Sequence, residues 1–277
     1  MLGIVDVGGG MRGVYAAGIL DYCLDNNITF DIAIGVSAGA SNLAVYISKQ
    51  RGRMLRFYRD YSQRSAYMGF KNYLTTGSFL GLNYMFHTLA DEGGEDPFDY
   101  ETFFKNTIPF EVVATDALSG KAHYFSRSEI EVNNCDILAA SANLPGVDKA
   151  YFYKGRPYFD GALSDPIPYK RLFDKGCDKV VVILTRPIEK RREASSDKIY
   201  VRLMGSKYPL ARAALANRAE TYNRSIDQMH SYIASGRLIV LFPDDTCGVT
   251  TVKRKREDIT ALYNKGYEEG SKLKELL

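Results

Sequence analysis

The chain has 277 residues, of which 45% are hydrophobic and 25% are charged. These fractions are typical of globular proteins and exclude a disordered or fibrous chain. The 36 basic and 33 acidic side chains leave a formal net charge of +3, which is too small to suggest a nucleic-acid-binding protein.

No uncharged apolar run reaches the roughly 18 residues that a membrane-spanning helix needs, and Met1 to Gly9 is too short and acidic for a signal peptide. We therefore expect a cytoplasmic protein, with peripheral contact at the inner face of a membrane as a further option. The four cysteines lie far apart and have no neighbouring histidine, so we expect buried thiols rather than a zinc site. We expect neither a metal nor a cofactor.

The first fifty residues predict two successive strand-turn-helix units. Strands are expected at Leu2–Val7 and Phe30–Ile34, and helices at Val14–Leu24 and Ala40–Ser48. The first helix is apolar on most of its faces, so it must be covered on both sides. This β-α-β-α order is typical of a parallel sheet with helices packed on its two faces.

Later segments continue the pattern less regularly. A hairpin is expected from Phe110–Ala114 and Ala122–Phe125, and buried strands are expected at Lys179–Leu184 and Leu238–Phe242. Further helices are predicted near Met54–Arg64, at Leu210–Ile233 and at Ile259–Leu277. No linker, internal repeat or low-complexity stretch marks a boundary, so we expect a single domain over residues 1–277.

Two glycine-rich turns follow the first two strands. The first, Gly8 to Gly13 (GGGMRG), matches the G-x-G-x-x-G pattern of dinucleotide-binding proteins. That interpretation needs an acidic residue at the end of the second strand, whereas Asp31 lies at its start. A phosphate-binding P-loop is excluded, because Val14 and Tyr15 stand where Lys and Ser or Thr are required.

The second turn, Gly35 to Gly39 (GVSAG), is a G-x-S-x-G sequence between a strand and a helix. Such a turn lifts the serine hydroxyl above the sheet, and its glycines are needed because a Cβ on either side would crowd the strand and the helix. The adjacent amide and the helix N-terminus can stabilise negative charge. Ser37 is therefore a candidate nucleophile.

A nucleophilic serine needs a base. The histidines, His87, His123 and His230, lie in no segment with other catalytic signals, and we interpret them as structural or surface residues. Asp160 follows the expected strand Arg156–Phe159 and would emerge at a strand end, where the active-site residues of open α/β sheets collect. Taken alone, its Asp-Gly sequence is an ordinary turn.

Three turns in this order, Gly8–Gly13, Gly35–Gly39 and Asp160–Ala162, resemble the patatin-like phospholipase family. The family pattern is G-G-G-x-R/K-G, then G-x-S-x-G, then D-G-A/G, and every defining position is present. The segment Ser141–Pro145 also resembles the Ser-x-x-x-Pro segment of the family, although Asp148 stands where the family usually has an aromatic residue. The resemblance covers roughly residues 2–184 and leaves residues 185–277 as a C-terminal part without an assigned role.

The resemblance implies a three-layer α/β/α fold with a mainly parallel central sheet, and an enzyme that hydrolyses acyl esters of lipids. It implies a dyad in which Ser37 attacks the ester and Asp160 acts as the general base, without a catalytic histidine or a metal. The other implied site residues form an oxyanion hole, a nucleophile elbow and a proton-acceptor motif. They are Gly8, Gly9, Gly10, Arg12, Gly13 and Ala38 for the oxyanion hole, Gly35 and Gly39 for the elbow, and Gly161 and Ala162 for the proton-acceptor motif.

Other functions stay open at this point. An α/β-hydrolase would pair Ser37 with a distant histidine, but its elbow normally follows several strands, whereas two strands precede Ser37. A non-catalytic lipid- or nucleotide-binding module would keep the turns without turnover. The expected partner is a lipid or acyl-ester substrate and no nucleic acid, and the sequence does not indicate an oligomeric state.

Two further groups of residues have more than one interpretation. The basic clusters Lys190–Arg192 and Lys253–Arg256 are interpreted as solvated loop charges, with contact to an anionic membrane as the alternative. Apolar residues between Tyr67 and Phe104 could line an acyl pocket, form a lid or pack in the core. They are Phe70, Tyr73, Leu74, Phe79, Leu80, Leu82, Tyr84, Met85 and Phe86.

Overall fold

The centre of the protein is an eight-stranded sheet in the order β5-β6-β3-β2-β1-β7-β8, with β4 paired to β3. The computed structural model describes residues 1–276, except for the side chains of residues 70 and 71. Neighbours among β3, β2, β1, β7 and β8 are parallel, whereas β4 and β6 run antiparallel to β3 and β5 runs antiparallel to β6. The strands are β1 (Leu2–Asp6), β2 (Ile32–Val36), β3 (Phe110–Asp116), β4 (Ala122–Ser126), β5 (Tyr151–Tyr153), β6 (Arg156–Asp160), β7 (Lys179–Ile183) and β8 (Leu238–Leu241).

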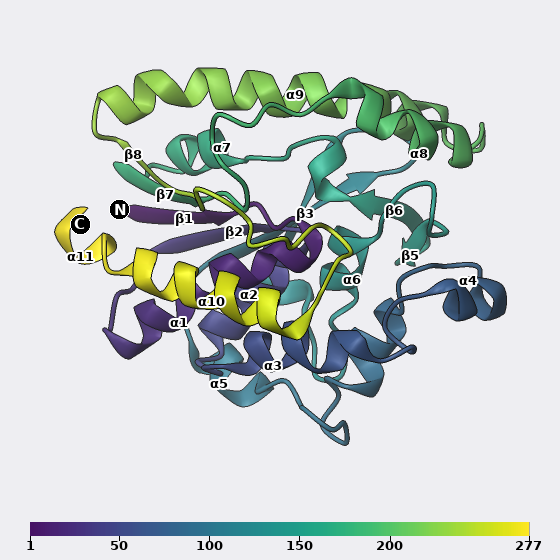
Figure 1. The fold of residues 1–277 in the computed structure, drawn as a ribbon, viewed down its shortest axis with the longest axis horizontal. Coiled ribbons are helices and arrows are strands. Elements are labelled where there is room, and N and C mark those ends of the chain that lie inside the picture. Colours follow the sequence, from purple (N-terminus) through teal and green to yellow (C-terminus); the bar gives the residue numbers. More distant parts are fainter. Residues whose placement is uncertain (277) are drawn as a thin grey trace.

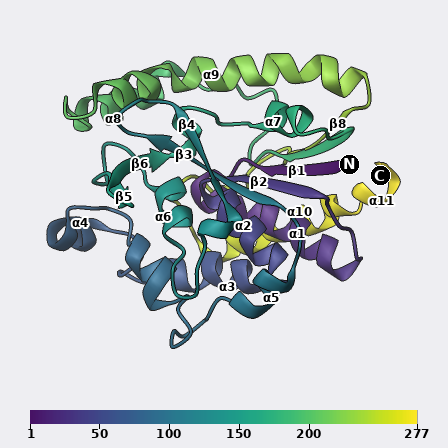
Figure 2. The same cartoon turned by 180° about the vertical axis from the view of Figure 1, so that it is seen from behind.

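Helices cover both faces of this sheet (Figure 1, Figure 2). Helices α7 and α9 lie on one face, and α1, α2, α3, α5 and α10 lie on the other, so the protein has three α/β/α layers. The helices are α1 (Val14–Asp25), α2 (Ala38–Ile47), α3 (Arg53–Arg59), α4 (Phe70–Thr76), α5 (Tyr100–Lys105), α6 (Asp136–Ala142), α7 (Tyr169–Asp174), α8 (Lys198–Leu203), α9 (Pro209–Ala234), α10 (Arg256–Gly270) and α11 (Leu273–Leu276).

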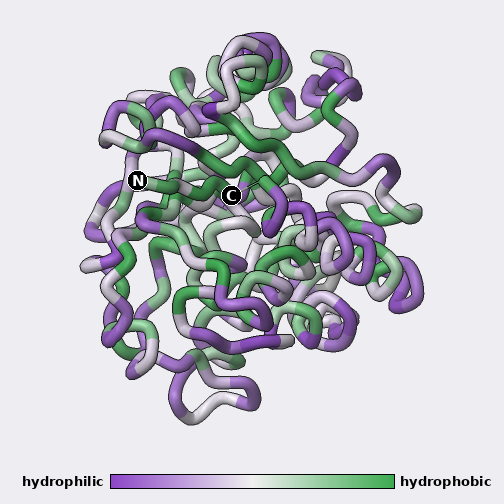
Figure 3. Tube along the Cα trace, turned by 90° about the vertical axis from the view of Figure 1, so that its left-hand side faces the viewer, coloured by the Kyte–Doolittle hydropathy of each residue, from purple (hydrophilic) through white to green (hydrophobic). Residues whose placement is uncertain are grey.

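The central strands are apolar on both faces because helices cover them on both sides. Ile4 and Val5 of β1 and Val180 to Ile183 of β7 are fully buried. In Figure 3 green stretches of the tube run through the interior, and many purple segments lie at the periphery. The two faces have separate hydrophobic cores, with Ile4 in the one under α1 and α2, and Val5 in the one under α7 and α9.

Helix α1 has the double cover that its composition requires, because α10 packs on the side away from the sheet. A Cβ on Gly18 would collide with the backbone of Tyr263, and a Cβ on Gly266 would collide with the backbone of Tyr15. The two helices therefore approach each other through glycines. The C-terminal part also extends the sheet through β8 and covers its other face with α9.

Most predicted elements are confirmed, with shifted ends. The hairpin is formed by β3 and β4, and the predicted strands near residues 179 and 238 are β7 and β8. The second strand runs over Ile32–Val36 rather than Phe30–Ile34, and the helix predicted over Met54–Arg64 divides into α3 and a 3-10 turn at Tyr61–Gln63. The predicted C-terminal helix divides into α10 and α11, and its last residue, Leu277, lies outside the described residues.

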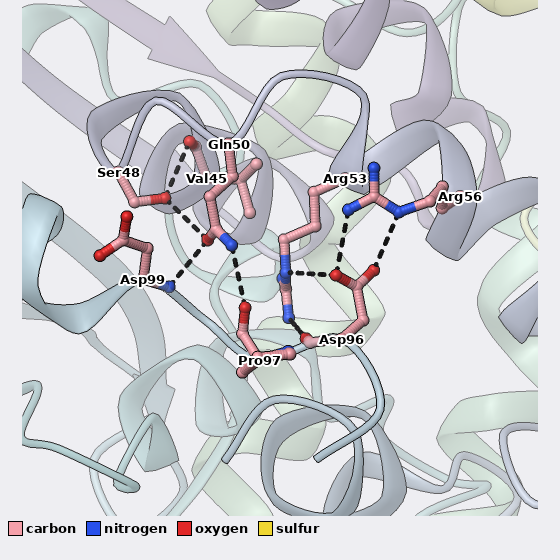
Figure 4. A network of polar contacts seen from close by, with 8 residues as sticks. All are labelled: Val45, Ser48, Gln50, Arg53, Arg56, Asp96, Pro97 and Asp99. Carbon is pink, nitrogen blue, oxygen red and sulfur yellow. Dashed lines mark hydrogen bonds and ion pairs between the residues drawn. The ribbon is translucent and has the colours of Figure 1, made fainter. Parts of the chain in front are cut away.

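The long segment after α3 is attached to the core by a polar network (Figure 4). The Asp96 carboxylate accepts hydrogen bonds from Arg56 at 3.0 and 3.3 Å, and the Asp96 carbonyl oxygen accepts one from Arg53 at 2.6 Å. Gln50 donates to the carbonyl oxygen of Pro97 at 2.9 Å and accepts from the Asp99 amide at 3.0 Å. These bonds fix the chain at residues 96–99, beyond the segment that contributes to the cavity described below.

Candidate active site

Ser37 occupies a sharp turn between β2 and α2. Its φ of 57° lies in the left-handed region that side chains rarely adopt, so the turn is strained. A Cβ on Gly35 would collide with Ala40, and a Cβ on Gly39 would collide with the carbonyl oxygen of Asp6. Both glycines are therefore sterically required. The turn is tighter than predicted, because Gly35 is still in β2 and Ala38 already begins α2.

The register of the sheet brings Asp160 next to Ser37. Ala114 of β3 pairs with both β4 and Asp160 of β6, so β4 and β6 lie on opposite edges of β3. Val113 pairs with both β4 and Val36 of β2, so β2 lies on the same edge as β6. The carboxyl ends of β2 and β6 thus meet head to head beside β3.

Asp160 lies at a strand end, as the sequence predicts, and this strand, β6, is antiparallel to β3. The carboxylate reaches Ser37 because β6 stops at Ala114, halfway along β3.

The Asp160 carboxylate is buried and held in place by a hydrogen bond. Its Oδ1 accepts from the Ala162 amide at 2.8 Å. Burial raises the pKa of Asp160 above its ordinary value of 3.8, although the nearby Ser37 side chain, the Ala162 amide and the charges of Arg218 and Arg192 act in the opposite direction. Gly161 is sterically required here, because a Cβ would collide with the carbonyl oxygen of Val113.

Two polar residues of the Ser141–Pro145 segment brace the strand ends. The Ser141 hydroxyl accepts from the Ser37 amide at 2.8 Å and donates to the Val113 carbonyl oxygen at 2.5 Å, so it fills the gap beside β3. The carbonyl oxygen of Asn143 accepts from the Asp160 amide at 2.8 Å. The family pattern pointed to this segment, but the roles of Ser141 and Asn143 depend on the head-to-head strand ends, which the sequence does not reveal.

The glycine-rich loop passes over the same site. Gly8, Gly9 and Gly10 have φ values of 65°, 132° and 62°, which favour glycine at each position. The Thr185 hydroxyl donates to the Gly8 carbonyl oxygen. Met11 and Arg12 are attached to Thr251, because the Met11 amide donates to its carbonyl oxygen at 3.2 Å and Arg12 Nη1 donates to its Oγ1 at 3.1 Å.

A buried polar cluster supports this loop from below, and sequence reasoning missed it. Asp6 Oδ1 accepts from the Gly8 amide at 2.9 Å, and Asp6 Oδ2 accepts from Asn42 at 2.8 Å. Asn42 in turn accepts from the Tyr58 hydroxyl at 3.1 Å and donates to the Gly13 carbonyl oxygen at 2.9 Å. Burial raises the pKa of Asp6 to about 7, because no cation offsets it. An Asp ending a buried strand and an Asn within an apolar helix were the available signals.

A cavity of about 790 Å³ opens above Ser37 and Asp160. Much of its wall is apolar and includes Phe57, Tyr67 and Met68 from the segment after α2. The residues that were predicted as an acyl pocket, a lid or core have different places. Phe79, Leu80, Leu82 and Met85 line the cavity, Phe86 is buried in the core, Tyr84 packs against it, and Tyr73 and Leu74 are exposed. Phe70 lies outside the described side chains.

Asp148 connects the cavity wall to the Ser141–Pro145 segment. Its Oδ1 accepts from the Leu80 amide at 3.0 Å and its Oδ2 accepts from the Leu144 amide at 3.2 Å. Burial raises the pKa of Asp148 to about 6. The buried Asp148 carboxylate, which stands where the family usually has an aromatic residue, is therefore satisfied by hydrogen bonds from backbone amides.

Comparison with known proteins gives the family. A family model described as patatin-like phospholipase matches residues 7–173, which is more than half of the chain. The chain belongs to the patatin-like phospholipase family. Its three motif turns, from Gly8 to Ala162, all lie within the matched residues. A second model, described as a domain of unknown function (DUF6363), matches residues 208–276.

The curated relatives of this chain share about a quarter of its residues over the aligned parts. The chain is 27% identical over 232 residues to the uncharacterized protein YjjU of Escherichia coli (strain K12), covering 82% of this chain and 64% of YjjU. It is 23% identical over 175 residues to uncharacterized NTE family proteins of Mycobacterium bovis and Mycobacterium tuberculosis, covering 63% of this chain and 46% of theirs. The chain thus spans less than two thirds of the length of these relatives.

Among solved structures, VipD from Legionella pneumophila aligns with 98% of this chain and 66% of its own chain. The sequence identity is 12% and the TM-score is 0.47.

No histidine is among the described residues that line the cavity. His87 contacts Asp136 at 3.0 Å, His123 packs against the ring of Phe125, and His230 is exposed on α9. Asp31 also lies outside the second strand, which begins at Ile32, and is engaged elsewhere. Asp31 accepts a hydrogen bond from the Leu2 amide at 2.7 Å, at the start of β1.

Other expectations concern ligands and membranes. Cys23, Cys135 and Cys177 are buried as expected, whereas Cys247 is half-buried. Over residues 1–276, His, Cys, Asp and Glu form no group suited to a metal ion. In the same part of the chain, no helix combines the length and the hydrophobicity that crossing a bilayer requires.

In the cluster Lys190–Arg192, Lys190 and Arg191 are exposed, as predicted for solvated loop charges, whereas Arg192 is partly buried. The three side chains contribute to the cavity wall, and the Arg192 side chain is only 20% exposed because it pairs with Asp197. The sequence showed the charges but not that they lie at the wall of the cavity that also contains Ser37.

Proposed function

We infer that the chain is a serine acyl-ester hydrolase that acts on lipids, of the phospholipase A or lipid acyl hydrolase type, with Ser37 and Asp160 as its dyad. The observation that carries this proposal is the proximity of the Ser37 side chain to the buried Asp160 carboxylate in the wall of one largely apolar cavity. Membership of the patatin-like family supports the same assignment.

The first half-reaction forms an acyl-enzyme. Ser37 Oγ attacks the ester carbonyl carbon while Asp160 takes the hydroxyl proton, and the carbonyl oxygen becomes an oxyanion. The amides of Gly9 and Gly10 and the Ala38 amide, which begins α2 and has no acceptor within the helix, stabilise this charge. Collapse of the intermediate breaks the ester bond, and the leaving alcohol takes the proton from Asp160.

The second half-reaction restores the enzyme. Asp160 takes a proton from water as the water oxygen attacks the acyl carbon, and the same amides hold the second oxyanion. Collapse then breaks the bond to Ser37 Oγ, which recovers its proton, and a fatty acid leaves. Arg12 and Gly13 hold the loop in position, Arg12 through Thr251 and Gly13 through Asn42.

Burial makes Asp160 a stronger base than an exposed aspartate, because it raises the pKa of the carboxyl group. Activity should therefore fall on acidification at a pH above the ordinary range of an aspartate. The proposal places the protein in the cytoplasm, with peripheral contact at the membrane face that supplies its substrate.

An organophosphonate probe tests the nucleophile directly. We expect a single covalent adduct on Ser37, located by peptide mass spectrometry, and no adduct on Ser37→Ala. Ser41→Ala is the matched control, because Ser41 also lines the cavity and is buried, so this variant should label like the wild type. An unlabelled wild-type protein would favour a non-catalytic lipid-binding module and contradict the proposal.

A further inference from the structure

The oxyanion loop, residues 8–13, needs partners that hold it in place. Gly8, Gly9 and Gly10 follow one another with positive φ values, and glycine has the greatest conformational freedom of all residues. None of the three has a side chain that could anchor the backbone. An oxyanion hole stabilises a transition state only when its amides are already in position. The surroundings of the loop must therefore fix it.

Thr185 holds the first part of the loop. This residue lies just beyond the end of β7 at Ile183, and it is 3% exposed. Its hydroxyl donates a hydrogen bond to the carbonyl oxygen of Gly8. A Cβ on Gly9 would collide with the same hydroxyl oxygen. The backbone at residues 8 and 9 therefore lies directly against Thr185.

Thr251 holds the second part of the loop. The Met11 amide donates to the Thr251 carbonyl oxygen at 3.2 Å, and Arg12 Nη1 donates to the Thr251 hydroxyl at 3.1 Å. A Cβ on Gly10 would collide with the carbonyl oxygen and the Cγ2 of Thr251. Each residue from Gly8 to Arg12 thus has a hydrogen bond to one of the two threonines or approaches it closely.

The segment that carries Thr251 is itself fixed. It connects β8 to α10 over residues 242–255, and both of these elements pack into the body of the protein (Figure 1). Near its end, Arg254 Nε donates to the Ser62 carbonyl oxygen at 2.7 Å. The Arg254 carbonyl oxygen accepts from Gln63 at 2.6 Å. Thr251 is therefore presented to the loop by a segment that is anchored at both ends and along its length.

We propose that Thr185 and Thr251 are positioning residues that clamp the oxyanion loop, so that the C-terminal part of the chain completes the active site. This inference rests on the proposed function and adds two residues to its machinery. Both threonines line the cavity, and both lie outside residues 7–173, which match the patatin-like model. Thr251 lies within residues 208–276, which match the model of unknown function. One role of that part is thus to support the loop.

Kinetics of four variants test the clamp. Thr185→Val and Thr251→Val keep the shape of each side chain and remove its hydroxyl. Loss of a whole oxyanion donor costs about 10²–10³-fold in kcat, so a loosened loop should lower kcat at least about tenfold. KM should stay within about threefold, because the loop amides act on the charge that forms in the transition state. Thr185→Ser and Thr251→Ser keep the hydroxyl and should restore kcat to within about threefold of the wild type.

Hydrogen exchange followed by mass spectrometry gives a second measurement, which does not depend on turnover. A peptide that covers residues 8–13 should exchange faster in both Val variants than in the wild type, whereas the remaining peptides should exchange as before. Thr260→Val is the matched control, because Thr260 lies on α10 and does not line the cavity. This variant should change neither kcat nor the exchange of the loop.

Three results would overturn the proposal. One is wild-type kcat in the folded Val variants, and another is a fall in kcat without faster exchange of residues 8–13. The third is an equal fall in the Ser variants, since the hydroxyl would then not be the cause. If the wild type neither hydrolyses esters nor reacts with the organophosphonate, but the exchange of the loop still depends on both threonines, the clamp is supported and only the proposed catalysis is contradicted.

Discussion

Replacement of Asp6 by Asn should destabilise the protein at acidic pH and stabilise it at alkaline pH. In the folded protein, the Asp6 carboxyl group accepts hydrogen bonds from the Gly8 amide and from Asn42, and it is fully buried without a cation. Burial raises the pKa of Asp6 from 3.8 to about 7. The folded state therefore binds more protons than the unfolded state between these two values, and stability falls as the pH rises through this window.

The expected size follows from linkage. Each pKa unit corresponds to about 1.4 kcal/mol, so ionisation of Asp6 lowers the free energy of unfolding by about 4 kcal/mol between about pH 4 and pH 7. The Asn variant has no such contribution, but its NH₂ group faces a buried donor and costs about 1–3 kcal/mol at every pH. Asp6→Asn should thus be less stable than the wild type near pH 4 and more stable near pH 8.

Urea unfolding of both proteins, followed by circular dichroism across this pH range, gives the difference directly. Every other titrating group contributes equally to both proteins, so the pH dependence of the difference belongs to Asp6 and its partners. A difference that stays constant with pH would refute the reasoning, because it would mean that the pKa of Asp6 is the same in the folded and unfolded states.

Further predictions concern residues around the site. Asp148→Asn should show the same kind of pH-dependent difference over a narrower window that ends near pH 6, with a total of about 3 kcal/mol, since burial raises the pKa of Asp148 to about 6; a total larger than that of Asp6→Asn would contradict this. Ser141→Ala should lower the free energy of unfolding by about 2–4 kcal/mol and reduce kcat, because the Ser37 amide and the Val113 carbonyl oxygen lose their partner; urea titration and steady-state kinetics measure both, and a variant with wild-type kcat would show that Ser141 does not position Ser37. A chelator such as EDTA should leave hydrolysis unchanged, because backbone amides can hold the oxyanion; activity lost and then restored by calcium or zinc would count against the mechanism.

Local sequence predicted much of the sheet because its central strands are buried on both faces. Uninterrupted apolar runs such as Val180–Ile183 and the glycine turns after β1 and β2 have few alternative structures. The short helices α4, α5 and α6 were not predicted. Six or seven residues provide too few turns for a clear period, and their formation depends on tertiary contacts such as those of Asp96 and Asp148.

In the candidate site, too, the sequence predicted the local turns but not the contacts between distant segments. The motifs pointed to Ser37, Asp160 and the glycine loop, since strained turns restrict residue choice. The head-to-head meeting of β2 and β6, the support of the loop by Asp6, and its contacts with Thr185 and Thr251 were not predicted. Each depends on residues that are distant in sequence and become neighbours only through strand order and helix packing.

The dyad is tested most directly by comparing kcat/KM of Asp160→Asn with that of each histidine variant on one short-chain acyl ester. Asp160→Asn keeps the shape of the side chain but removes the base, so we expect a loss of at least about 100-fold, approaching the loss of about 10³–10⁶-fold for Ser37→Ala. His87→Ala, His123→Ala and His230→Ala should each remain within a few-fold of the wild type. A histidine variant that is folded by circular dichroism but as inactive as Ser37→Ala would contradict the Ser37–Asp160 dyad.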